Sequence, residues 1–217
     1  MEGILVELAG SSQMIVDPSP EIAQNVYKLL IGAVVPRPIA FVSSLSMDGV
    51  PNLAAFSFFT VISANPPVIC FSPMIRASDG RRKDTLNNIE RTREFTVNIV
   101  SEDFAAQMNK TAPEFPPEVN EFEVSGLTPI PSDLIGPARV KESRIQMECR
   151  LMQVVHVSDQ PLGGSLVIGE VLRFHFADEL EIEDFRIDPA KLKPIGRMGG
   201  PKYVRTTDLF DLQRPRS

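Results

Sequence analysis

Residues 39–57 read IAFVSSLSMDGVPNLAAFS, and this stretch decides the fold class. The apolar run Ile39-Ala40-Phe41-Val42 is rich in residues that favour strands. Asp48-Gly49 is a dipeptide typical of the tight turn between two antiparallel strands. The stretch therefore predicts a β-hairpin whose second strand carries Asn52 to Phe56.

Working outward, the same strand signals recur between short helical segments. The Ser19-Pro20-Glu21 start predicts a helix that ends near Gly32, with an apolar face of Ile22, Val26, Leu29 and Leu30. Further short helices are predicted at 84–90 and 101–108, and strands at 4–6, 14–16, 61–62, 68–71, 95–100, 144–157 and 165–176. Many short strands with short helices between them favour a barrel or a sandwich over a parallel α/β sheet. We therefore expect a mainly β protein.

Composition indicates an ordinary globular chain of one domain, residues 1–217, with a core at about 30–180 and a tail at 187–217. Of its 217 residues 43% are hydrophobic and 23% are charged, and 19 prolines argue against long helices. A net charge of −6 argues against nucleic acid as a partner. No apolar run reaches the roughly 20 residues of a membrane span, and no signal peptide is evident. Cys70 and Cys149 fit reduced core thiols, so we expect a cytoplasmic protein.

Motifs for several chemistries are missing from the sequence. There is no GxGxxG, no P-loop and no GxSxG elbow. His156 and His175 stand at spacings unrelated to the cysteines, which argues against a zinc site, so we expect them to be ordinary strand histidines and no metal to be bound. Glu148 is interpreted as part of strand alternation. No catalytic acid, base or nucleophile can be named.

Two segments indicate ligand binding. Arg81-Arg82-Lys83 precedes a helix that opens at Asp84-Thr85, and free amides at a helix start favour an anion. The alternative, which the fragment alone favours, is a solvated charged loop with an aspartate cap. Small residues in 52–57 would let a flat ligand approach the backbone. A buried strand explains that segment equally well.

In order along the chain, these fragments resemble the flavin reductase-like proteins with an FMN-binding split β-barrel, the group that includes flavoredoxin. The resemblance is carried by PRPIAFVSS at 36–44, DGVPNLAAFS at 48–57, NPP at 65–67, KDTLNNI at 83–89 and EFTVN at 94–98. It continues through NEF at 120–122, GLT at 126–128, EC at 148–149, GEV at 169–171 and PIGRMGGPKY at 194–203. It implies a six-stranded Greek-key barrel that dimerises and holds FMN, with FAD as an alternative.

The resemblance also implies roles for individual residues. The backbone of Asn52, Leu53, Ala54, Ala55, Phe56 and Ser57 would meet the pyrimidine edge of the flavin. Ser43 and Ser44 would contact the phosphate or the ribityl chain. Lys83, Asp84 and Thr85 would form the phosphate site, with Arg37 a weaker candidate for the same pocket. Arg197 and Tyr203 in the tail would cover the flavin from one side.

Two departures from the family pattern bear on the electron donor and on the strand segment that would lie against the flavin. Many NADH-using relatives carry Gly-Asp-His just before the strand that ends in Gly-Glu-Val, but residues 163–171 read GGSLVIGEV and contain no histidine. Direct use of NAD(P)H is therefore in doubt. Ala55 replaces a frequent proline, and alanine also leaves the backbone close to a ring.

Three functions follow from this pattern. The first is an NAD(P)H-dependent flavin reductase that serves a partner such as a monooxygenase. The second is a flavoredoxin-like electron carrier with tightly bound FMN, favoured by the missing histidine and by the acidic stretch 114–123 of the Pro-rich loop at 111–138. That stretch could dock a basic protein, and the alternative is a solvated face. The third is a binding module that has kept the barrel and lost the flavin. We rank the reductase narrowly ahead of the carrier.

Overall fold

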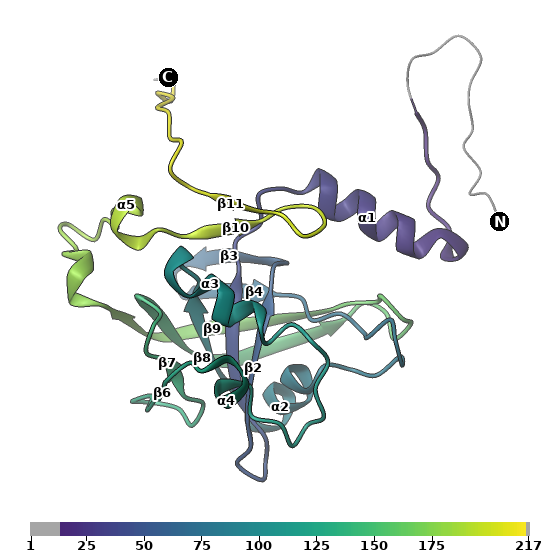
Figure 1. Ribbon diagram of the computed structural model, residues 1–217, viewed down its shortest axis with the longest axis horizontal. Helices are drawn as coiled ribbons and strands as arrows, with labels where there is room; N and C mark the ends of the chain where they lie inside the picture. The colour runs from purple at the N-terminus through teal and green to yellow at the C-terminus, as the bar shows by residue number, and fades with distance from the viewer. Residues whose placement is uncertain (1–13, 216–217) are drawn as a thin grey trace.

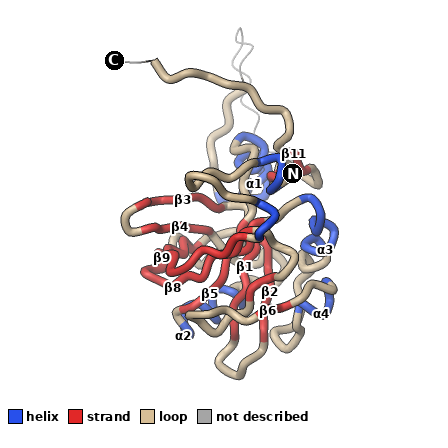
Figure 2. The backbone as a smooth tube through the Cα atoms, turned by 90° about the vertical axis from the view of Figure 1, so that its left-hand side faces the viewer, coloured by secondary structure: helices blue, strands red, loops and turns tan. Residues whose placement is uncertain are grey.

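The computed structural model describes residues 14–215, so the strand expected at 4–6 lies outside the described residues. At 14–16 only an isolated bridge at Ile15 is found. The strands are β1 (Ala40–Leu45), β2 (Pro51–Phe56), β3 (Phe59–Ala64), β4 (Pro67–Phe71), β5 (Glu94–Ile99), β6 (Pro129–Ile130), β7 (Arg139–Val140), β8 (Ile145–His156), β9 (Ser165–Phe176), β10 (Ile195–Arg197) and β11 (Tyr203–Arg205). The α-helices are α1 (Ala23–Ala33), α2 (Asp84–Thr92), α3 (Ala105–Asn109), α4 (Glu121–Ser125) and α5 (Pro189–Leu192). Single 3₁₀ turns occupy η1 (Pro20–Ile22), η2 (Glu102–Phe104) and η3 (Asp178–Leu180). The prediction of a mainly β protein is confirmed (Figure 2).

One antiparallel sheet of seven strands forms the body of the molecule, in the order β2-β1-β5-β8-β9-β4-β3 (Figure 1). Its two edge strands, β2 and β3, are separated in the chain only by Ser57 and Phe58. A sheet whose first and last strands are joined by two residues has to curl round on itself, so it forms a barrel that is open along this seam. The sheet has seven strands, where six were expected, because residues 51–64 divide at this point into strands with different neighbours.

The predicted hairpin is the β1–β2 pair. Val42 lies opposite Ala54, and Ser44 lies opposite Asn52. Gly49 closes the turn with a φ of +81°, a conformation that favours glycine. The Asp48-Gly49 signal therefore placed this turn correctly.

Both faces of β1 are buried, which explains its continuous apolar run. Ala40 and Val42 belong to a core inside the curled sheet, together with Phe71 and Phe95. Ile39 and Phe41 belong to a second core outside it, formed with α3, α4 and β10. Helix α2 adds Leu86 and Ile89 to the inner core. The start of α2 is thereby fixed against the sheet, beside β2.

Gly169 on β9 shows how tightly the inner core is packed. A Cβ atom at this position would lie 2.4 Å from Cζ of Phe95, a side chain with no exposed surface. Only glycine lets the strand and the ring pack this closely. The glycine of the GEV motif thus has a packing reason.

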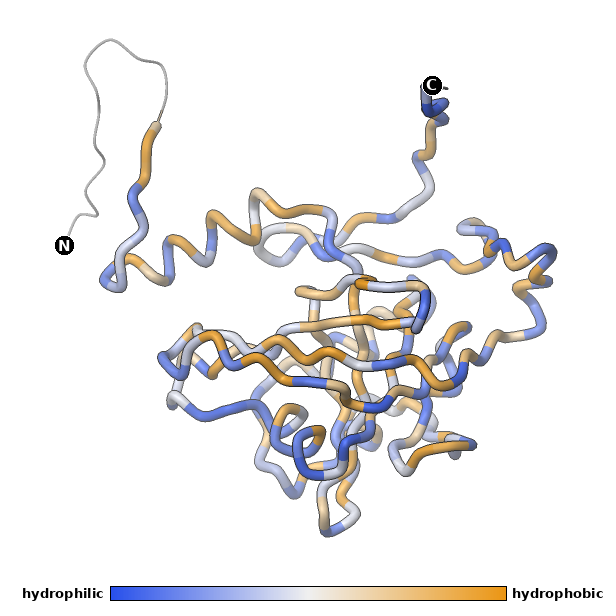
Figure 3. Tube along the Cα trace, turned by 180° about the vertical axis from the view of Figure 1, so that it is seen from behind, coloured by the Kyte–Doolittle hydropathy of each residue, from blue (hydrophilic) through white to orange (hydrophobic). Residues whose placement is uncertain are grey.

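Helix α1 differs most from the prediction. It runs to Ala33, past Gly32, and none of its residues is buried. Leu29 and Leu30 on the predicted apolar face are about half exposed, at 50% and 53%. The helix stands above the sheet beside the tail, and Figure 3 shows apolar segments along it. None of the helices that the structure describes is long and apolar enough to span a membrane.

Candidate functional site

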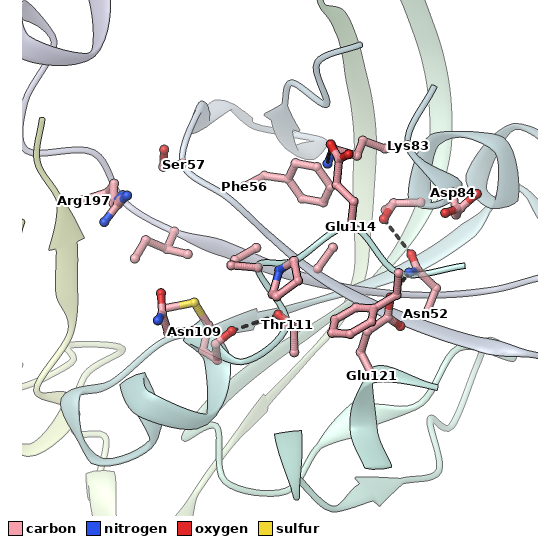
Figure 4. A pocket seen from close by; sticks show the side chains of 18 of the residues that line it. Asn52, Phe56, Ser57, Lys83, Asp84, Asn109, Thr111, Glu114, Glu121 and Arg197 are labelled. Carbon is pink, nitrogen blue, oxygen red and sulfur yellow. Dashed lines mark hydrogen bonds and ion pairs between the residues drawn. The ribbon is translucent and has the colours of Figure 1, made fainter. Parts of the chain in front are cut away.

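A cavity of about 220 Å³ lies against β2, where separate parts of the chain converge (Figure 4). Strand β2 forms its floor, the start of α2 one end, α3 and the segment after it a wall, and the tail the other end. Its lining residues are Ile39, Asn52, Ala54, Ala55, Phe56, Ser57, Arg76, Lys83, Asp84, Thr85, Met108, Asn109, Thr111, Ala112, Pro113, Glu114, Phe115, Glu121, Arg197 and Tyr203.

The α2 end of the cavity has the properties of an anion site. Lys83 is the N-cap residue of α2, and no side chain caps this helix. Within the described residues the amides of Asp84 and Thr85 have no hydrogen-bond acceptor. Arg76 is 6% exposed, donates from Nη2 to Asp84 at 2.8 Å, and leaves its buried Nε without a partner in the described chain. Asp84 therefore does not form the aspartate cap of the alternative interpretation, and the free donors favour an incoming anion.

Glu114 reaches this end of the cavity from the opposite wall. Its Oε1 lies 3.4 Å from Nζ of Lys83, and its Oε2 accepts a hydrogen bond from Ser78 at 2.5 Å. The Ser78 hydroxyl, with a smaller contribution from Lys83, lowers the pKa of the Glu114 carboxyl. A carboxylate thus stands where the site would bind an anion.

A directed hydrogen-bond network runs along the edge of the floor. Glu121 accepts from Nδ2 of Asn52 at 2.9 Å and from the amide of Leu53 at 3.0 Å. The Asn52 Oδ1 therefore faces the hydroxyls of Thr85 and Ser44, at 2.6 and 3.2 Å. Burial raises the pKa of Glu121, although these donors act in the opposite direction. Glu121 holds the Asn52 amide in a single orientation.

The tail end of the cavity carries an aromatic and a cationic group in contact. The guanidinium of Arg197 lies 4.5 Å from the centre of the Tyr203 ring, a favourable cation–π distance. The Tyr203 hydroxyl lies 3.4 Å from Oδ1 of Asn109. Strands β10 and β11 pair these two residues directly, Arg197 opposite Tyr203, and so bring both to the cavity.

The structure brings most of the predicted site residues together. Those that line the cavity are Asn52, Ala54, Ala55, Phe56, Ser57, Lys83, Asp84, Thr85, Arg197 and Tyr203. Ser44 lies just behind it, bonded to Asn52. Ser43 and Leu53 are buried outside the lining, and Leu53 is part of the outer core. For Ser43 and Leu53, as for the residues that line the cavity, contact with a ligand stays a prediction.

Arg37 has a different role from the one expected of a pocket residue. Its guanidinium donates four hydrogen bonds, to Ser57 Oγ and to the carbonyls of Ile31, Val34 and Met198. Four of its five N–H donors therefore join the end of α1 and the tail to the barrel seam, and contact of Arg37 with a ligand stays a prediction.

Sequence reasoning missed Arg76, Glu114 and Glu121. The Pro-rich segment 111–138 was predicted to be a loop, but it contains α4 and β6, and α4 places Glu121 in the cavity lining. The NEF motif at 120–122 was the available signal for Glu121, because Asn120 caps α4 through the amide of Phe122. No local signal marked Arg76.

Glu148 also differs from its interpretation as a residue of strand alternation. It has no exposed surface and accepts from the amides of Asp133 and Leu134, at 2.9 and 2.7 Å, and from His175 at 2.6 Å. Burial alone would raise its pKa, but these hydrogen bonds and the His175 ring lower it overall. Asp133, Glu148 and His175 form a cluster of metal-ligand type among the described residues. Arg173, 2.8 Å from Asp133, opposes a cation there.

A second, larger hollow of about 900 Å³ lies between α1 and the segments around Met74 and Leu162. Phe58 lines it, one residue beyond Ser57 of the first cavity. Its surface is mostly apolar and Glu21 is the one charged residue among those that line it. The smaller cavity gathers the charged and polar groups, so it is the candidate site.

Comparison with known proteins agrees with this geometry. Residues 32–190 match the family model described as a flavin reductase like domain. Nitrilotriacetate monooxygenase component B from Bacillus cereus is 40% identical, with a TM-score of 0.84 over 93% of this chain and 100% of that one. The 2-nitrobenzoate 2-nitroreductase NbaA of Pseudomonas fluorescens is 35% identical, with a TM-score of 0.79 over 88% and 91% of the two chains.

The fold itself is supported by a more distant structure. A protein with a split barrel domain from Shewanella frigidimarina NCIMB 400 is 24% identical, with a TM-score of 0.77 over 91% of this chain and 98% of that one. The expectation of a split barrel is confirmed by this likeness and by the seam between β2 and β3. The family match spans most of the chain and includes β2 and the start of α2. The chain therefore belongs to the flavin reductase-like domain family.

Proposed function

We propose that the cavity binds FMN and that the protein is an NAD(P)H-dependent flavin reductase. The observation that carries the proposal is the pairing, in one cavity, of an anion site with a flat floor of small residues. The anion site would hold the phosphate through Lys83, Arg76 and the free amides of α2. The floor formed by Ala54 and Ala55 leaves room for a planar ring against the strand.

The edge position of β2 supports the binding of the flavin ring. The amide of Leu53 points away from β1, because it donates to Glu121. Amides two residues apart on a strand point the same way, so the amide of Ala55 also faces outward. Ala55 lines the cavity, and no acceptor for its amide is found in the described part of the chain. We infer that it donates to the flavin ring edge.

The hydride chemistry would belong to the cofactor: a bound flavin accepts and releases hydride at N5. This chain's residues would bind, orient and shield it. Asn52, fixed by Glu121, would present its second amide proton to the ligand. Arg197 and Tyr203 would cover one face, so we propose that the tail belongs to the same functional domain as the barrel.

A second candidate, the FMN electron carrier, is favoured by the histidines. The chain has two, and neither lines the cavity. The His156 ring contacts Ser165 Oγ at 3.0 Å and Glu90 at 2.9 Å, while His175 contacts Glu148. No histidine of this chain is therefore placed to meet a nicotinamide. A protein donor would then replace NAD(P)H.

We further propose a homodimer and, for the reductase, a monooxygenase partner. The partner is suggested by the likeness to a monooxygenase component B. The dimer is supported by the uncovered apolar face of α1 and by Val61 and Ile62, which are 69% and 51% exposed on edge strand β3. Sedimentation at the mass of the 24.0 kDa monomer would overturn the dimer.

The visible absorption spectrum of the purified protein, before and after anaerobic NADH or NADPH, tests the function. A flavin spectrum that bleaches supports the reductase. A flavin spectrum that persists supports the carrier. A purified protein that is colourless and binds neither FMN nor FAD when these are added refutes both functions and leaves a barrel without flavin.

A further inference from the structure

We infer that Glu114 occupies the phosphate position of the ligand-free cavity and weakens the binding of flavins that carry a phosphate. The inference rests on the proposed function, and it concerns whether the flavin is held permanently or exchanges. It starts from the contact of Glu114 with Lys83, two partly exposed side chains that both line the cavity.

The cations of the anion site already have partners. Lys83 faces Glu114 at 3.4 Å, and Arg76 is bonded to Asp84 at 2.8 Å. Asp84 is fixed in place, because it is the first residue of α2 and its partner Arg76 is buried. Glu114 comes from another part of the chain. Of the two anions, Glu114 is the one that can leave.

Three hydrogen-bond donors of the anion site remain without an acceptor, and they indicate which ligand Glu114 replaces. The Asp84 and Thr85 amides and the buried Nε of Arg76 lack acceptors among the described residues. A single carboxylate leaves these donors unsatisfied, whereas a phosphate carries three terminal oxygens that could accept from them. The site is therefore more complete with phosphate than with Glu114.

The segment that carries Glu114 is held only lightly. Residues 112–119 form no helix or strand, and they contain Pro113, Pro116 and Pro117. The side chains of Lys83 and Glu114 are each about one-third exposed. An ion pair of this exposure stabilises a structure by at most about 1 kcal/mol. The hydrogen bond that Glu114 accepts from Ser78 is also exposed, so a phosphate dianion has to displace Glu114 from two solvent-accessible contacts. The displaced carboxylate would still repel the phosphate from nearby.

Glu114 therefore acts as a determinant of affinity. It would favour release of FMN and have no effect on riboflavin, which lacks the phosphate. This behaviour suits a flavin that is handed to a partner enzyme as a substrate. It would not suit a permanently bound group.

The test compares Glu114→Gln with the wild-type protein in equilibrium titrations of FMN and of riboflavin. Glu118→Gln is the matched control, because it removes the same charge from an exposed residue of the same segment outside the cavity lining. We expect Glu114→Gln to bind FMN about two- to fivefold more tightly, with riboflavin unchanged. The gain should shrink at high salt. Thermal unfolding of each variant confirms that it is folded.

Three outcomes would overturn the inference. Glu114→Gln could bind FMN no more tightly than wild type, it could change FMN and riboflavin equally, or Glu118→Gln could match its effect. A wild-type protein that binds neither ligand would refute the proposed function, and this inference with it. FMN binding that is retained without a Glu114 effect would refute the inference alone.

Discussion

Replacing Gly169 with alanine should destabilise the protein through a single contact. The new Cβ would lie 2.4 Å from Cζ and 2.8 Å from Cε1 of Phe95. Carbon atoms pack at about 3.5–4.0 Å, so the ring or the strand would have to move by about 1 Å. Phe95 has no exposed surface and already packs edge-on against Phe71, with ring centres 5.6 Å apart. The ring has no free space into which it can move.

Overpacking of this kind costs about 1–3 kcal/mol of unfolding free energy. For a chain of this length each kcal/mol lowers Tm by about 2–4 °C. Scanning calorimetry of Gly169→Ala should therefore show a Tm lower by about 2–12 °C. Gly32→Ala is the control, because a Cβ at Gly32 meets nothing within 4 Å and alanine favours the helix.

The reasoning also predicts a rescue. Phe95→Leu makes a cavity by itself, but together with Gly169→Ala it should recover part of the lost stability, since the smaller side chain makes room for the methyl group. The coupling energy of this double-mutant cycle should be about 1 kcal/mol or more. A Tm for Gly169→Ala equal to that of wild type, or strictly additive changes in the cycle, would refute the steric explanation.

Three further predictions concern the cavity and the two buried glutamates. Lys83→Ala should weaken FMN binding about tenfold in fluorescence titrations and leave riboflavin binding unchanged. The substitution removes a charge-assisted contact with the phosphate, made by a side chain that is 31% exposed. Equal losses of affinity for both ligands would exclude a phosphate contact. Burial raises the pKa of Glu121 above its ordinary 4.5, so ionisation of this carboxyl opposes folding. The wild-type protein should therefore lose stability relative to Glu121→Gln as the pH rises above 4.5 and Glu121 ionises. The pKa of Glu148 is lowered, so its contribution is present at neutral pH and lost as pH falls below 4.5. Urea unfolding of Glu148→Gln should therefore show less loss of stability in acid than wild type, and an unchanged pH slope in either variant would contradict the assignment.

Local sequence patterns predicted the elements well where a local cause forms them. The Asp48-Gly49 turn and the strands expected at 95–100, 144–157 and 165–176 appeared close to where they were predicted. Helix α2 was predicted close to its observed bounds. The spacing of apolar residues predicted one apolar face on α1, but spacing along the chain does not show whether another part of the protein covers that face.

The candidate site was predicted in part. The residues of β2 and the start of α2 could be named, because a family resemblance pointed to contiguous motifs there. Arg76 and Glu114 could not, because they stand in irregular segments that only the tertiary structure brings to the cavity, beside Asp84 and Lys83. Arg37 was named as a weaker candidate for the pocket by its place in a motif, and only the tertiary structure shows its hydrogen bonds to α1 and the tail.

By itself the sequence determined the mainly β class, the hairpin and the family, since these depend on the order of residues along the chain. Only the tertiary structure decided which charges face one another. The curling of the sheet brings β2 beside the start of α2, and packing of the outer core sets α4 and its Glu121 against Asn52. Glu121 meets Asn52, 69 residues away in the chain, because burial of apolar surface fixes the elements that carry them.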